Sequence, residues 1–147
     1  MSRENPARTL EQTWAGMSWE VERGSFALLG FAEAPVAADL EALGAGPGQV
    51  VREGGETTLL LPCSALAEAL ARHPGASVEC DLAWVRFRSP MDWGVVGFLA
   101  RVTGELAAAG IPLGAVCGFS RDHLFVARGH LPRARDVLAR LFGPEAD

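Results

Sequence analysis

The stretch from Trp84 to Ala127 reads WVRFRSPMDWGVVGFLARVTGELAAAGIPLGAVCGFSRDHLFVA and is the most informative part of the chain. From Val85 to Arg88 apolar and charged side chains alternate, as in a strand with one buried face. Ser89-Pro90 then interrupts the extended pattern. Apolar residues next recur at helical spacing, which predicts a helix from about 93 to 109 with Asp92 as its N-cap.

The rest of this half predicts a hairpin and a second helix. Gly110 follows the first helix at the position where glycine commonly ends one. Two short strands, 111–117 and 123–127, are separated by a turn. Pro132 then stands at the start of a helix running to about Phe142, where its missing N–H costs nothing. The order is strand, helix, strand, strand, helix.

The same order of elements precedes this half. Strands are predicted at 25–31, 49–52 and 57–61, and helices at 36–43 and 64–72. We therefore expect an α+β protein of two ferredoxin-like (βαββαβ) units, with antiparallel sheets and helices on one face. The units are placed at 25–82 and 83–147, after an N-terminal extension, 1–24, that is expected to be partly disordered.

Each unit lacks its last strand unless a neighbouring segment supplies it. Residues 84–88 suit either the closing strand of the first unit or the opening strand of the second. The apolar and polar residues of 17–23 also alternate, and this segment is a candidate edge strand for the second unit. Shared strands would protect the free sheet edges from aggregation.

Composition narrows the function classes. The 147 residues carry a net charge of −5, which opposes binding to nucleic acid as a general partner. All basic residues are arginine, so a Schiff-base lysine and a P-loop lysine are both excluded. No long apolar run suggests a membrane span, and the N-terminal sequence is unlike a secretory signal. A cytoplasmic location is expected.

Cysteine spacing gives no sign of a disulfide framework or a zinc site. Cys63, Cys80 and Cys117 are too few and too far apart, and no Cys-x-x-Cys pair occurs. We expect no metal and no cofactor. A catalytic pair of Cys117 and His123 would need a shared strand face and a third group, and neither is evident. The chain is expected not to be an enzyme.

Three segments of the second half resemble a known family. They are Trp84-Val-Arg-Phe-Arg88, Met91-Asp-Trp-Gly-Val-Val-Gly97 and Leu106-Ala-Ala-Ala-Gly110-Ile-Pro112. Here the chain is similar to tandem ACT-domain proteins related to the CASTOR arginine sensors, whose bacterial members are small two-unit proteins. The strands 26–31 and 57–61 look like their first-unit equivalents. The resemblance spans about 25 to 142. It departs from the family pattern at Cys117-Gly118-Phe119 and Arg121-Asp122-His123, where the hydroxyl-bearing residues of the family are missing.

The resemblance implies a regulatory protein that binds a small molecule, an amino acid by preference, where two units meet. A helix starting at Asp92 would offer free N–H groups and a positive dipole end to a ligand carboxylate. The expected ligand-binding residues are Asp92, Trp93, Gly94, Val95, Gly110, Ile111 and Asp122. A simple N-cap role for Asp92 and a turn role for Asp122 stay open.

Two other classes of function remain alternatives. The first is a non-catalytic interaction module that oligomerises and binds no metabolite, with Trp14 and Trp19 in a docking or swapped strand; ACT folds tend to associate, so a homodimer is the candidate assembly. The second is RNA binding on the sheet, which would require exposed aromatic rings at Trp84 and Phe87 beside a basic groove.

Overall fold

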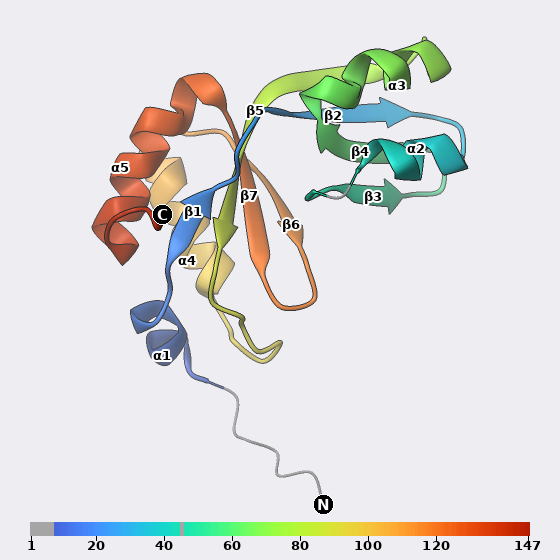
Figure 1. Ribbon diagram of the computed structural model, residues 1–147. Helices are drawn as coiled ribbons and strands as arrows, with labels where there is room; N and C mark the ends of the chain where they lie inside the picture. Colours follow the sequence, from blue (N-terminus) through green and yellow to red (C-terminus); the bar gives the residue numbers. More distant parts are fainter. Residues whose placement is uncertain (1–7, 45) are drawn as a thin grey trace, which may run out of the picture. The chain divides into compact units, whose positions relative to one another are not determined.

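The computed structural model describes residues 8–44 and 46–147 (Figure 1). They form two compact units. The middle unit is Arg23–Ala83; the split unit joins the chain before Arg23 to Trp84–Asp147. Strand β5 (Ser77–Phe87) contributes residues to both. Part of the segment expected to be disordered, residues 1–7, lies outside the described residues.

The middle unit has the predicted elements in the predicted order. They are β2 (Phe26–Phe31), α2 (Ala37–Ala42), β3 (Gln49–Arg52), β4 (Thr57–Pro62), the 3₁₀ turn η1 (Cys63–Ala65), α3 (Leu66–Arg72) and the first part of β5. The sheet order is β3-β4-β2-β5, and β2 lies antiparallel to both β4 and β5. Alternate residues Ala27, Leu29 and Phe31 face Leu59, Leu61 and Ala69 in one apolar core. The expected antiparallel α+β arrangement is confirmed.

The split unit takes strands from both ends of its sequence. Its elements are α1 (Leu10–Ala15), β1 (Trp19–Val21), the second part of β5, α4 (Phe98–Ala108), β6 (Gly114–Cys117), β7 (Asp122–Ala127), η2 (Arg128–His130) and α5 (Leu131–Phe142). The sheet order is β1-β5-β7-β6. β1 lies antiparallel to β5, with Trp19 opposite Phe87 and Val21 opposite Val85. The segment 17–23 thus contains a strand that pairs with β5.

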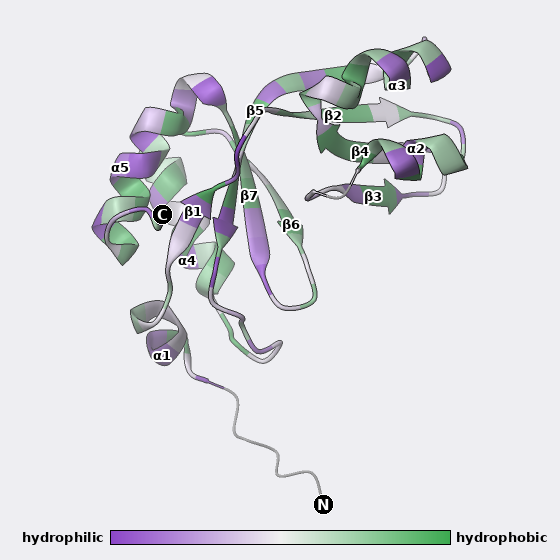
Figure 2. Cartoon of the chain, in the orientation of Figure 1, coloured by the Kyte–Doolittle hydropathy of each residue, from purple (hydrophilic) through white to green (hydrophobic). Residues whose placement is uncertain are grey.

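Helices pack on one face of the split-unit sheet. Leu131, Ala134, Val137 and Leu138 of α5 are buried at helical spacing, and Figure 2 shows hydrophilic and hydrophobic residues alternating along this helix. The Phe87 ring lies 5.0 Å from Phe98 of α4. Because neighbouring strand residues point to opposite faces, Arg86 and Arg88 lie on the face away from Phe98.

Trp19 belongs to the split-unit core, which corrects the docking-strand interpretation for this residue, and Trp14 is half-buried beside that core. Trp19 is 1% exposed, and its Nε1 donates to the Gly143 carbonyl oxygen at 3.0 Å. The Trp14 ring lies 5.7 Å from Phe98 and 4.5 Å from Phe142. A large apolar ring stabilises a fold by burial, so the Trp19 ring is not available to a partner.

Helix α1 was missed, although the sequence carries a signal for it. The Thr9 hydroxyl accepts from the Gln12 N–H at 3.2 Å, and Gln12 Oε1 accepts from the Thr9 N–H at 3.0 Å. This reciprocal arrangement is a capping box. The polar composition of residues 8–12 hid it, because they lie in the extension that was expected to be partly disordered.

The helix predicted at 93–109 begins five residues later, at Phe98. Gly97 is its N-cap, with φ of +95°. This left-handed conformation suits glycine and cannot continue an α-helix. Gly94 also disfavours helix, and residues 91–97 form a loop instead. Asp92 is therefore not the N-cap of α4. Among the described residues, no helix has the length and apolar character needed to cross a bilayer.

Candidate functional site

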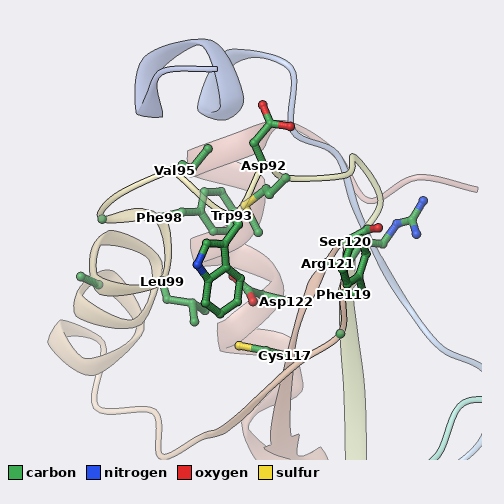
Figure 3. A pocket seen from close by; sticks show the side chains of 14 residues that line it. Asp92, Trp93, Val95, Phe98, Leu99, Cys117, Phe119, Ser120, Arg121 and Asp122 are labelled. Atoms are coloured by element: carbon green, nitrogen blue, oxygen red, sulfur yellow. The ribbon is translucent and has the colours of Figure 1, made fainter. Parts of the chain in front are cut away.

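A pocket opens between the 91–97 loop, the start of α4 and the 117–122 hairpin (Figure 3). Its volume is about 270 Å³, and all of its lining residues belong to the split unit. The Met91 N–H donates to the Ser120 carbonyl oxygen at 2.8 Å and ties the loop to the hairpin. The Gly118 N–H donates to the Arg121 carbonyl oxygen at 2.8 Å and closes the turn. These two backbone hydrogen bonds thus hold the 91–97 loop and the hairpin turn together.

The first turn of α4 forms one wall. Gly97, Phe98, Leu99 and Ala100 all line the pocket. The first N–H groups of any α-helix lack partners within the helix, and no side chain of a described residue caps this end. The positive end of the helix dipole therefore borders the pocket.

Four of the seven predicted site residues come together here: Asp92, Trp93, Val95 and Asp122. Gly94 does not line the pocket. Gly110 and Ile111 follow the far end of α4, where their N–H groups bond the Ala107 and Leu106 carbonyl oxygens. Ile111 is 4% exposed and belongs to the core.

Asp92 is exposed at the rim and accepts from the Arg8 N–H at 2.9 Å through Oδ2. The lining residues that sequence reasoning missed include Phe98, Leu99 and Ala100 at the helix start, and Phe119 in the turn. Gly97, the N-cap of α4, was the residue in the sequence that could have indicated where the helix starts. The Phe119 side chain is 102% exposed and Trp93 is 95% exposed, an unusual state for aromatic rings.

Asp122 controls the chemistry of the neighbouring thiol. Asp122 and Cys117 are cross-strand partners next to the turn of the hairpin. A hydrogen bond to the Asp122 carboxylate, burial and the carboxylate's negative charge together raise the pKa of the Cys117 thiol. The thiol is therefore neutral at pH 7 and a poor nucleophile.

The pairing also separates Cys117 from His123. His123 is opposite Val116, one position along the ladder, so its side chain points to the other face. A Cys–His couple is not assembled by this hairpin. Within residues 8–44 and 46–147, no cluster of three or more His, Cys, Asp or Glu side chains is arranged to hold a metal ion.

Arg121 contributes to the pocket wall, but its charge is directed elsewhere. Its Nε donates to the Arg88 carbonyl oxygen at 2.9 Å. The guanidinium end points away from the other labelled side chains in Figure 3. The inner surface therefore combines a helix N-terminus, the Asp122 carboxylate and exposed aromatic rings.

The RNA-binding alternative lacks its stacking surface. Trp84 is 3% exposed and Phe87 is 0% exposed. Their rings pack against Phe125 and Phe98 respectively. Rings buried in this way cannot stack on unpaired bases.

Comparison with known proteins places the fold. No curated protein matches the chain in sequence. A protein from Agobacterium tumefaciens is similar in structure, with a TM-score of 0.72 and 22% identity over 88% of this chain and 90% of that one. A Vibrio cholerae protein, described as a possible transport protein, has a TM-score of 0.66 and 22% identity, covering 88% and 92%.

Regulatory parts of aspartate kinases share the same fold. The ligand-free regulatory subunit of aspartate kinase from Thermus thermophilus has a TM-score of 0.61 at 14% identity, covering 84% of this chain and 96% of that one. Residues 77–140 match the ACT domain family. This segment includes β5, α4, the β6–β7 hairpin and most of α5, and it contains the whole pocket. The chain has an ACT-like α+β fold.

Proposed function

We propose that the chain is a regulatory, non-catalytic ACT protein of the cytoplasm that binds an amino acid in the split-unit pocket. The observation that carries the proposal is the uncapped start of α4 on one wall, with the Asp122 carboxylate also in the lining. An amino acid has a carboxylate that is complementary to the helix start and an amino group that is complementary to Asp122. The ACT match over 77–140 and the likeness to aspartate kinase regulatory subunits support the regulatory part.

The ligand carboxylate would lie at the first turn of α4. Free N–H groups and the helix dipole favour an anion there. Its amino group would donate to the Asp122 carboxylate, which keeps acceptor capacity beside the Cys117 thiol. The exposed Trp93 and Phe119 rings would cover the apolar part of the ligand. A volume of about 270 Å³ is slightly below that of sites for drug-sized molecules and suits a smaller ligand.

Two ACT units in tandem, at 25–82 and 83–147, are part of this proposal. The strand orders β3-β4-β2-β5 and β1-β5-β7-β6 support it. In the split unit β1 takes the place of the missing last strand, so it is counted as the fourth strand there. With this numbering both orders place the first and third strands at the centre, as a ferredoxin-like sheet does. The relation to the CASTOR-type sensors belongs to the same proposal.

A thermal-shift screen of the full chain against the amino acids tests the function. A ligand that binds only the folded state stabilises it by about 2.7 kcal/mol at a hundredfold excess over Kd. We expect one amino acid or a small related group to raise the midpoint, and Asp122→Asn to reduce that shift. No shift with any amino acid would refute amino-acid binding.

A second candidate function is a homodimerising interaction module. The exposed apolar side chains favour it: Trp93 at 95%, Val96 at 83% and Phe119 at 102%. Edge strand β6 lies at one end of the sheet order and is mostly exposed. Sedimentation velocity of the chain and of Trp93→Ser tests this reading. A monomer at all concentrations would exclude it, and a dimer lost in the variant would support it.

A further inference from the structure

A charged hollow lies on the split-unit sheet, on the face turned away from α4. Its volume is about 350 Å³, and its lining consists of Glu20 on β1, Arg86 on β5, Arg88 directly after β5, and Arg121 from the hairpin turn. Arg86 is directly opposite Glu20 in the β1–β5 register. Phe87, between the two arginines, is 0% exposed and packs on Phe98. The alternation of β5 thus presents both guanidinium groups to the same side.

The arginines outnumber the carboxylates that pair with them. Glu20 accepts from Arg86 Nε at 2.8 Å, and its other oxygen lies 3.4 Å from Arg88 Nε. Glu22 lies 3.0 Å from Arg86 Nη1. No carboxylate of a described residue forms an ion pair with Arg121. Three guanidinium groups face two carboxylates, Glu20 and Glu22, which leaves one positive charge in excess.

Arg88 and Arg121 both line this hollow. Arg121 Nε donates to the Arg88 carbonyl oxygen at 2.9 Å, which fixes the Arg121 side chain along the end of β5. The Arg121 donor fork is otherwise unused by the described residues, and Arg88 makes only the long contact with Glu20. Guanidinium forks match the oxygens of carboxylate and phosphate groups bidentately. Like charges held together in this way are stabilised by an anion between them.

A neighbouring histidine reports the positive surroundings. Burial lowers the pKa of His123, and the charges of Arg86 and Arg121 lower it further, against the opposing effect of Asp122. Its Nδ1 is buried without a hydrogen-bond partner among the described residues. The imidazole is therefore neutral at pH 7 and adds no charge to the hollow.

We infer that the hollow between Arg88 and Arg121 is a binding site for a small anion with phosphate or carboxylate oxygens. It is separate from the amino-acid pocket and independent of the function proposed for that pocket. Among the described residues, Arg121 is the one that lines both hollows. The anion takes the place that a third carboxylate would fill in the ladder of Arg–Glu pairs.

Titration of the full chain with inorganic phosphate, followed by NMR, tests the site. We expect saturable shifts of the amides of 86–88 and 121, and a rise in the pKa of His123 as phosphate neutralises the nearby guanidinium groups. Malonate, titrated in parallel, tells whether carboxylate oxygens are accepted. Sodium chloride at matched ionic strength controls for general screening.

Three variants should change the affinity for phosphate in different ways. Arg121→Gln weakens phosphate binding about tenfold or more, as expected for lost charge-assisted hydrogen bonds. Glu20→Gln raises the positive excess from one to two and strengthens binding. Arg140→Gln removes an arginine that is 64% exposed and paired to Glu105 elsewhere, and leaves binding unchanged. Equal affinity in wild type and folded Arg121→Gln, or no change in the His123 pKa on saturation, would overturn the inference.

Discussion

Asp39 and His73 meet in the middle unit, with His73 Nε2 lying 2.9 Å from Asp39 Oδ1. Asp39 is 0% exposed and also accepts from Arg72 Nε at 3.0 Å and from the Val36 N–H at 2.9 Å. The His73 ring stacks on Phe31 at 3.6 Å between centroids. One carboxylate therefore caps α2 and connects it to the end of α3.

Removing this carboxylate should destabilise the middle unit. Asp39→Asn keeps the shape but removes the charge that compensates Arg72, which is partly buried at 25% exposed. Breaking one partner of a buried ion pair costs about 3–5 kcal/mol, and we expect about 3 kcal/mol because Arg72 keeps some solvent. Urea unfolding measures the change. Glu41→Gln, an exposed acid on the same helix, is the control; an equal small effect of both variants would refute the role.

The same residue predicts part of the acid sensitivity. Burial raises the pKa of Asp39, but hydrogen bonds from Val36, His73 and Arg72 outweigh it and hold the pKa below its ordinary value. An acid with a lowered folded-state pKa stabilises the fold above its unfolded pKa of about 3.9, and this contribution is lost as pH falls through the lower folded value. Free energies of unfolding measured from pH 6 downward should fall less steeply in Asp39→Asn. An unchanged acid slope would contradict the assignment.

Trp19 and Trp93 provide a matched pair for testing the split-unit core. Trp19→Ala removes a ring that is 1% exposed and a hydrogen bond to Gly143, and should cost about 3–5 kcal/mol or prevent folding. Trp93→Ala removes a ring that is 95% exposed and should leave the free energy of unfolding nearly unchanged. Denaturant unfolding of the two variants side by side checks both. Similar stability losses would mean that Trp93 is covered in solution.

Much of the fold was readable because its local signals were strong. The sequence predicted strands at 49–52 and 57–61, and β4 pairs with β3 there. The placement of β1 was harder, since three residues carry little pattern and their pairing with β5 spans more than sixty positions of the sequence. The alternation of 17–23 marked a candidate edge strand, but the register with β5 depends on tertiary burial of Trp19, which no local signal contains.

The candidate site was predicted only in part, for a reason visible at Gly97. Helical spacing of Val95, Leu99 and Val102 suggested a helix through the loop, but glycine at a left-handed position ended it. The free N–H groups of the helix start are therefore those of Phe98–Ala100, not those predicted after Asp92. The excess positive charge at Arg121 could not be predicted from the sequence, because the number of ion pairs depends on which carboxylates the fold brings close to each arginine.

Ala100 distinguishes ligand recognition from helix stability. It is exposed in the first turn of α4 and lines the pocket. Ala100→Glu should preserve or slightly raise thermal stability, because an acid in the first turn favours the helix dipole. The same acid should repel a ligand carboxylate and weaken amino-acid binding about tenfold. Calorimetry measures the affinity, with Ala100→Gln as the control of similar size; equal affinity of the two variants would remove the helix start from the site.

Asp122 should also set the reactivity of Cys117. The carboxylate raises the pKa of the Cys117 thiol, so Asp122→Asn should lower that pKa and increase the thiolate fraction. We expect faster alkylation of Cys117 by iodoacetamide at pH 8 in the variant, measured by peptide mass spectrometry. Cys80, an exposed thiol of the middle unit, serves as the internal reference and should keep its rate. If Cys117 reacts no faster than in wild type, the hydrogen bond between the two side chains does not persist in solution, and Asp122 is then free to bind a ligand through both oxygens.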